Sequence, residues 1–247
     1  MADDDPSGLL EHTSHRPWPL CDSRPAMLQI WSNLMFAHWP LDYGTVRALV
    51  PPALPLDRYD GAAWIGVTPF ELRLQLRGLA MPILRRVPEL NVRTYVTVEE
   101  KPGVYFFSLD IRSLAAVLGA RTFYRLPYYP ARMHALTSGA TVRYESERIS
   151  RHRARFRASY RPISELRHAR LGSLEHFLTE RYCLYTAGRR GVFRTDIHHL
   201  PWPLQDASAA IAENSMASAA GLAVPDHQPL THFCRRLEVL LWRPRRV

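Results

Sequence analysis

The sequence has little cysteine and almost no lysine. Its three cysteines, Cys21, Cys183 and Cys234, lie far apart and form no CxxC pair, which argues against a disulfide framework and against a cysteine zinc site. Lys101 is the only lysine, so arginine supplies the other 31 of the 32 basic residues and dominates the formal charge of +9. A GC-rich genome produces the same arginine bias, so this charge alone indicates no partner.

Several motifs and segments are also absent. No apolar run approaches the ~20 residues of a membrane span, and the acidic start MADDDPSG lacks the apolar core of a signal peptide. Neither GxGxxG nor GxxxxGK occurs, and HExxH, HxH and GxSxG are missing as well. We therefore expect a soluble, cytoplasmic protein that uses no metal and no cofactor.

The distribution of apolar residues favours strands over helices. Many alternating segments and few short helices predict an α+β fold that is mainly antiparallel β. We expect a flexible arm over residues 1–25 and a single domain over residues 26–247. The longest helix is predicted over 173–188, where Ser173 can cap the start, and an alanine-rich helix or linker is predicted over 206–219.

One expected strand carries an unusual set of polar side chains. In PELNVRTYV, residues 88–96, alternation places Glu89, Asn91 and Arg93 on one face. An arginine can grip a carboxylate with two hydrogen bonds, and a buried glutamate can move protons. From the pattern alone, a solvent-exposed hairpin face is the favoured interpretation.

The next strand is expected to pair with this one as a hairpin. Pro102 and Gly103 form a typical central pair for a type II turn. In that register, Asp110 on the return strand lies diagonal to Arg93, which predicts an ion pair between them.

A run of arginines raises a second function class. In RHRARFR, Arg151, Arg153, Arg155 and Arg157 alternate with other residues, and Arg161 continues the row. Such a strand face could bind nucleic acid or another polyanion without sequence specificity. No helix-turn-helix, zinc finger or RNA-recognition motif accompanies it. A solvated strand face whose charges prevent edge pairing is the favoured interpretation, so nucleic acid is not the expected partner.

A family resemblance runs through nearly the whole chain, from about residue 27 to 244. Its segments include WSNLMFAHWP, LVPPALPLDRYDGAAWIGVTPF, PELNVRTYV, PGVYFFSLD, ARTFYRLPYYPARM, LEHFLTERYCLY, HLPWPL and LEVLLW. Together they resemble the YqjF-like family of uncharacterised bacterial proteins, which resembles the acetoacetate decarboxylase-like superfamily. The resemblance implies a β-rich, cone-shaped barrel with a few peripheral helices and a small-molecule pocket inside. It also implies that the polar row on residues 88–96 faces that pocket, and superfamily relatives commonly assemble as oligomers.

The chemistry of the superfamily does not carry over. Acetoacetate decarboxylases share a motif that consists of Gly-Arg-Glu, a short spacer and Pro-Lys-Lys. One of the two lysines forms a Schiff base with the keto acid. The matching positions here hold Arg121 and Pro127, but Tyr128 and Tyr129 replace the two lysines. A phenol forms no imine, and Lys101 lies on another element, so imine-based decarboxylation is not expected.

One set of residues is therefore expected to bind a small organic ligand that is anionic or carbonyl-bearing. A cofactor-independent enzyme of the lyase, isomerase or hydrolase type and a non-catalytic binding protein both remain open, as does a structural role with a filled pocket. The candidates are Glu89 for proton transfer or for orienting an arginine, Tyr128 for donating a hydrogen bond or a proton to an oxyanion, Arg93 and Arg121 for anion recognition, Asn91 as a polar contact, and Glu180 and Arg181 on the expected helix.

Overall fold

The computed structural model describes residues 7–79, 81–150 and 152–247. The first six residues of the expected arm, and Arg151 of the arginine row, lie outside this part. The strands are β1 Met27–Leu41, β2 Ala63–Leu76, β3 Leu84–Val98, β4 Lys101–Ile111, β5 Tyr128–Ser138, β6 Thr141–Arg148, β7 Arg155–Pro162, β8 Cys183–Gly188, β9 Gly191–His198, β10 Gln205–Asn214, β11 Leu230–Leu241 and β12 Arg245–Arg246. The helices are α1 Ser7–Leu10, α2 Tyr43–Arg47, α3 Leu114–Gly119, α4 Leu174–Thr179 and α5 Met216–Ala219, with a π-helical turn η1 at Ala120–Tyr124.

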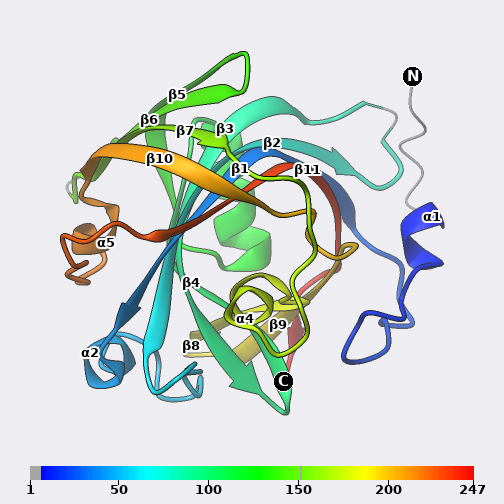
Figure 1. The fold of residues 1–247 in the computed structure, drawn as a ribbon. Coiled ribbons are helices and arrows are strands. Elements are labelled where there is room, and N and C mark those ends of the chain that lie inside the picture. The colour runs from blue at the N-terminus through cyan, green and yellow to red at the C-terminus, as the bar shows by residue number, and fades with distance from the viewer. Residues whose placement is uncertain (1–6, 80, 151) are drawn as a thin grey trace.

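The strands form one sheet that closes on itself (Figure 1). Its order is β12-β9-β8-β4-β3-β2-β1-β11-β10-β7-β6-β5, and further pairings join β9 to β11 and β4 to β5. The β9–β11 pairing closes a ring of β9, β8, β4, β3, β2, β1 and β11. The β4–β5 pairing closes a second ring through β10, β7 and β6. The described pairings are antiparallel except β4–β5 and β4–β8, so the predicted mainly antiparallel α+β class is confirmed.

The two rings share β1 to β4 and β11, and this sharing explains where the core lies. A strand in both rings is covered on both faces, and the second halves of β1 and β3 are accordingly buried at successive positions. Strand β7 belongs to one ring and alternates instead: Phe156, Ala158 and Tyr160 are buried while Arg155 and Arg157 are exposed. The alternation predicted for the arginine row is therefore confirmed for the described residues.

The predicted hairpin of β3 and β4 exists, but its turn and register were wrong. Val98 pairs with Lys101, so Glu99 and Glu100 form the two-residue turn, with φ of 51° and 56°. Two left-handed residues give the twist that suits a tight hairpin. Pro102 and Gly103 lie inside β4. Asp110 pairs with Leu90, not with Tyr95. A bulge in β4 places one extra residue between the pairs Val92–Ser108 and Arg93–Phe106, which moves Asp110 further from Arg93 along the ladder.

The predicted ion pair between Arg93 and Asp110 is also wrong. Asp110 instead accepts two hydrogen bonds of 2.7 Å from Arg148, and both side chains are buried. Arg148 reaches it from β6, on the second ring, which a hairpin register could not reveal.

The segment predicted as the longest helix and the alanine-rich segment predicted as a helix or linker each contain a strand. Ser173 caps α4 as expected by accepting from the His176 amide, but the helix ends at Thr179 and residues 183–188 form β8. Strand β8 pairs with β9 and β4, and this pairing outweighs the helical spacing of its apolar residues. The alanine-rich stretch expected as a helix or linker contains β10, which pairs with β7.

The described part of the N-terminal arm contacts the sheet. Arg16 Nη1 donates to the Ile197 carbonyl at 2.8 Å, and the Cys21 thiol donates to Asp196 at 3.2 Å. Within the described residues, no helix is long and apolar enough to cross a membrane.

Candidate functional site

An internal cavity of about 70 Å³ lies inside the seven-stranded ring. Each strand of that ring supplies at least one lining residue, and further lining residues come from the start of β5, from the loop between α4 and β8 and from the loop after β9. The volume is well below the roughly 300–1,000 Å³ of pockets for drug-sized ligands. The cavity therefore suits a small molecule or the end of a larger one.

The polar row of β3 forms one side of this cavity. Glu89, Asn91 and Arg93 all line it, whereas the alternate residues Leu90 and Val92 pack in the apolar core on the other face. The period of two along a strand produces this separation. The three side chains are 4–7% exposed, so the row is not a solvent-exposed face.

Arg93 is a buried cation without a carboxylate partner among the described residues. Its Nη2 donates to Thr68 Oγ1 at 2.7 Å, and its guanidinium lies 5.0 Å from the centre of the Phe36 ring. Its Nε is buried and has no hydrogen-bond partner. Burial lowers the pKa of Arg93, but a guanidinium stays protonated in proteins. A positive charge thus faces the cavity unbalanced.

Two further polar atoms in the cavity wall are buried and unpaired among the described residues. They are Oδ1 of Asn91 and Nε1 of Trp202. Buried polar atoms normally have partners, so unpaired ones in a cavity wall call for an explanation. With Arg93 Nε they present two donors and one acceptor, which matches a ligand carrying carboxylate, carbonyl or hydroxyl oxygens.

Glu89 and Tyr128 form a hydrogen-bonded pair in the same wall, with 3.0 Å between Oε2 and the phenolic oxygen. Burial raises the pKa of Glu89 to about 8; the Tyr128 hydrogen bond acts in the opposite direction and Asp110 adds to the increase. Glu89 is therefore mainly protonated at neutral pH. Burial also raises the pKa of Tyr128 well above its ordinary value, so the phenol keeps its proton.

Of the three remaining predicted residues, Arg181 lines the cavity, whereas Glu180 and Arg121 do not. Arg181 lines the cavity, but its Nη1 is paired with Asp57 at 2.7 Å. Glu180 is buried outside the lining, where it accepts from the Trp202 amide at 2.9 Å and from the Tyr182 hydroxyl at 2.5 Å. Arg121 is exposed on η1 and donates to the Tyr128 carbonyl at 2.7 Å. The structure thus brings five of the predicted residues to the cavity and leaves Arg121 and Glu180 outside it.

The lining also includes polar residues that the sequence did not single out, among them Trp202 and Thr68. Trp202 stands in the segment HLPWPL, which is part of the family resemblance, and its ring stacks on that of Trp31 with 5.7 Å between the ring centroids. Thr68 on β2, the partner of Arg93, lies opposite Asn91 in the ladder. No local pattern marks either residue, because sheet closure brings them to the cavity.

The exposed arginine row faces glutamates from adjacent strands. Arg155 pairs with Glu147 at 3.0 Å and Arg157 with Glu213 at 3.8 Å. Acidic residues therefore interrupt the positive face.

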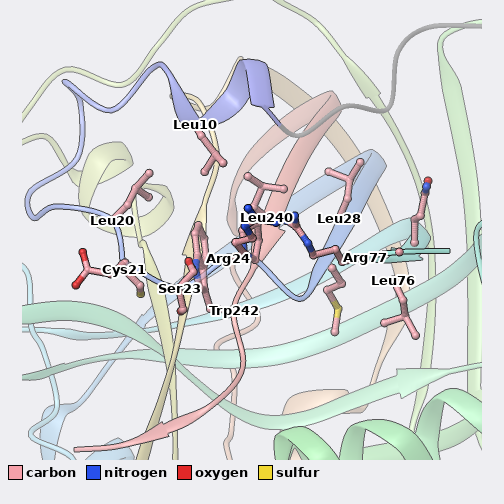
Figure 2. A pocket seen from close by; sticks show the side chains of 15 residues that line it. Leu10, Leu20, Cys21, Ser23, Arg24, Leu28, Leu76, Arg77, Leu240 and Trp242 are labelled. Carbon is pink, nitrogen blue, oxygen red and sulfur yellow. The ribbon is translucent and has the colours of Figure 1, made fainter. Parts of the chain in front are cut away.

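Larger clefts lie along the N-terminal segment. One of about 630 Å³ is bounded by residues 20–25 and by the ends of β1, β2 and β11, and Figure 2 shows Arg24 and Arg77 there among apolar side chains such as Leu240. A neighbouring cleft of about 1010 Å³ includes Lys101. Neither cleft contains the buried unpaired cation that marks the internal cavity, and none of the cavity's lining residues is a lysine.

The fold and its internal cavity define the class of protein. The chain is similar to an acetoacetate decarboxylase-like enzyme from Sphingomonas wittichii RW1, with a TM-score of 0.61 and 13% identity over 94% of this chain and 97% of the other. It is also similar to the enduracididine biosynthesis enzyme MppR in complex with pyruvate, with a TM-score of 0.60 and 12% identity over 91% of both chains. The fold is acetoacetate decarboxylase-like, as the sequence resemblance predicted.

The sequence match is more specific. Residues 28–238 match the uncharacterised conserved protein family DUF2071. Uncharacterized protein YqjF of Bacillus subtilis (strain 168) is 48% identical over 219 residues, covering 87% of this chain and 90% of the relative. The chain belongs to the DUF2071 family.

Proposed function

We propose that the protein binds a small carboxylate or carbonyl compound in the internal cavity, with Arg93 contacting an anionic oxygen. The observation that carries this proposal is the buried Arg93 guanidinium with no carboxylate partner among the described residues. A buried charge is stable only when something compensates it. An anionic ligand supplies that compensation, and Asn91 and Trp202 supply further polar contacts.

The cavity also has the groups for proton transfer. Glu89 is protonated at neutral pH and hydrogen-bonded to Tyr128, so the pair can give a proton, or a hydrogen bond, to an oxygen that gains negative charge. Glu89 and Arg93 are four residues apart on β3, roughly 13 Å between Cα atoms at the rise of a strand. Asn91 lies between them. A ligand held at Arg93 by its carboxylate therefore extends towards the Glu89–Tyr128 pair.

This arrangement supports a cofactor-independent reaction such as tautomerisation, hydration or lactone opening. Imine chemistry needs an amine, and no lysine lines the cavity. The similar fold of MppR, whose structure contains pyruvate, supports a small carboxylate as the ligand class. We assign anion recognition to Arg93 and not to Arg121, because Arg121 is exposed outside the cavity.

The polyanion alternative has weaker support. Arg155 and Arg157, in the middle of the exposed row, are paired with Glu147 and Glu213, and these pairs reduce the basic charge that a phosphate-binding face requires.

A thermal-shift screen tests the proposal. The panel contains 2-oxo and 3-oxo acids, lactones, aromatic acids and simple carboxylates, each tested on the parent, on Arg93→Met and on Arg121→Met. A ligand at about one hundred times its dissociation constant adds ~2.7 kcal/mol, which raises the melting temperature by roughly 5–10 °C for a chain of this size. We expect a hit that Arg93→Met abolishes and Arg121→Met retains.

The two arginine variants make the outcome specific. A hit lost equally in Arg121→Met would move the site out of the cavity. The absence of any hit, with Arg93→Met folded, would contradict small-anion binding and favour a structural role for the cavity. Turnover of a hit compound by the parent, and its loss in Glu89→Gln, would separate an enzyme from a binding protein.

A further inference from the structure

A second, apolar space adjoins the internal cavity. It is a groove of about 330 Å³ between the α3–η1 segment and the ends of β1, β2, β3 and β11. Its wall includes leucines of β2, such as Leu72 and Leu74, and small residues of α3, such as Ala116 and Gly119. In Figure 1 the green helical segment of α3 lies near the centre of the view, framed by these strands.

The groove and the cavity share a wall. Gln29, Leu126, Tyr128 and Leu241 line both spaces. Tyr128 is the residue that contacts Glu89, so the apolar groove begins beside the proton-bearing end of the polar row. The two spaces are thus neighbours across one layer of side chains.

Exposed apolar side chains lie at the mouth of the groove. Ile83 is 52% exposed and Phe123 on η1 is 72% exposed, and both line the groove. An exposed apolar patch next to a cavity is typical of a ligand-binding groove. The groove volume also reaches the lower end of the range for larger organic ligands, which the cavity alone does not.

We propose that cavity and groove hold one ligand, a carboxylate or carbonyl compound with an apolar tail. The polar head lies with Arg93 and Asn91 in the cavity, and an alkyl or aryl tail passes Tyr128 into the groove. This inference rests on the proposed function, because the head site is the same. It adds that the ligand class is amphiphilic and that groove residues set the preferred tail length.

A chain-length series of saturated carboxylates tests this directly. Butyrate, hexanoate, octanoate and decanoate are titrated below their micelle concentrations by calorimetry. Each methylene that enters the groove is expected to tighten binding about fourfold, which corresponds to ~0.8 kcal/mol per buried CH₂.

Gly119→Phe is the variant that fills the groove. Gly119 has helical dihedral angles, φ −60° and ψ −48°, and a Cβ added there meets no atom within 4 Å. A side chain is therefore accommodated without backbone strain and favours the helix. Gly188→Phe is the matched control, because Gly188 is exposed at the end of β8, has open space around its Cβ and lines neither space.

We expect Gly119→Phe to leave butyrate binding unchanged and to remove the gain from longer chains, while Gly188→Phe binds like the parent. Equal affinities along the series in the parent would overturn the tail site and leave the head site standing. Failure of every carboxylate to bind would overturn both. A Gly119→Phe protein that keeps the chain-length dependence but changes its oligomeric state, measured by analytical ultracentrifugation, would assign the groove to a second copy of the chain and overturn the inference.

Discussion

The phenolic oxygen of Tyr128 lies 3.0 Å from Oε2 of Glu89, and both side chains are at most 8% exposed. Glu89 reaches this point from β3 and Tyr128 from the start of β5, the strand that closes the second ring onto β4. Because burial keeps Glu89 protonated at neutral pH, it does not neutralise Arg93 further along β3. The cavity therefore holds a net positive charge and a proton donor at opposite ends.

Replacing Glu89 with Gln is expected to change how stability depends on pH. The pKa of Glu89 rises from 4.5 to about 8 in the folded protein, so the folded state holds a proton that the unfolded state has lost across this window. The unfolding free energy of the parent therefore falls as pH rises through the window and levels off above it. The shift corresponds to at most roughly 4–5 kcal/mol at 1.36 kcal/mol per unit. Glu89→Gln has no titrating group at this position and therefore lacks this pH-dependent contribution to the unfolding free energy.

Urea unfolding of both proteins between about pH 5 and about pH 9 measures the difference. The variant should gain stability relative to the parent as pH rises. Parallel curves would mean that Glu89 is ionised throughout the range, and the proton-donor role would then fail.

Tyr128→Phe is expected to raise the pKa of Glu89 further. The Tyr128 hydroxyl donates to the Glu89 carboxylate and so stabilises its charged form. Without it, burial acts unopposed. The protonated carboxyl band in a pH series of infrared difference spectra reports the change, and Glu89→Gln identifies the band. A downward shift in the pKa would show that a different group dominates the titration.

The sequence was informative wherever the physical cause was local. Strict alternation along residues 88–96 was enough to place Glu89, Asn91 and Arg93 on one face, and a family resemblance indicated which side that face meets. The capping of α4 by Ser173 is equally local. These features need no knowledge of distant residues.

Features created by sheet closure could not be predicted in this way. The apolar spacing in residues 183–188 suits a helix, but partners on β9 and β4 make this segment a strand. Arg148 reaches Asp110 from β6, a strand that does not pair with β4, and Trp202 enters the cavity wall from a loop. Arg121 occupies the position of the arginine in the decarboxylase motif, but it lies on the π-helical turn η1, where its side chain is exposed at the surface.

Gly103 illustrates the same limit and gives a stability prediction. It was interpreted as a turn residue, but it lies in β4, where an added Cβ would be 2.7 Å from the Cys183 carbonyl, the Cys183 sulfur and the Tyr185 ring. Gly103→Ala is therefore expected to destabilise the protein by roughly 2–4 kcal/mol through overpacking. Gly119→Ala, in open space on α3, should stabilise it by up to about 1 kcal/mol. Urea unfolding compares them, and equal stabilities would contradict the close approach of β4 to β8.

The exposed arginine row is expected to be dispensable. Arg155 and Arg157 are more than half exposed and form ion pairs with partly exposed glutamates, and such pairs contribute about 0–1 kcal/mol each. A double Arg155→Ser, Arg157→Ser variant should unfold within about 1 kcal/mol of the parent. Neither protein should shift DNA in a mobility assay at ~150 mM salt. A shift by the parent that the double variant loses would establish polyanion binding.

Arg93 and Arg148 are both buried arginines, but the same substitution is expected to destabilise the protein strongly only at Arg148. Arg148 forms two 2.7 Å hydrogen bonds with Asp110, which is fully buried. Arg148→Met leaves that carboxylate uncompensated and should cost roughly 3–5 kcal/mol. Arg93→Met breaks a charged hydrogen bond to Thr68, worth roughly 1.5–3 kcal/mol, but it also removes the desolvation cost of a buried charge without a carboxylate partner, which is of similar size.

The stability of Arg93→Met should therefore lie within about 1 kcal/mol of the parent, or above it. Chemical unfolding of the three proteins at neutral pH, without ligand, makes this comparison. A residue whose removal does not destabilise the fold but abolishes ligand binding serves the ligand. If Arg93→Met instead proved as destabilised as Arg148→Met, the charge of Arg93 would already be compensated within the protein, and the anion site would lose its main support.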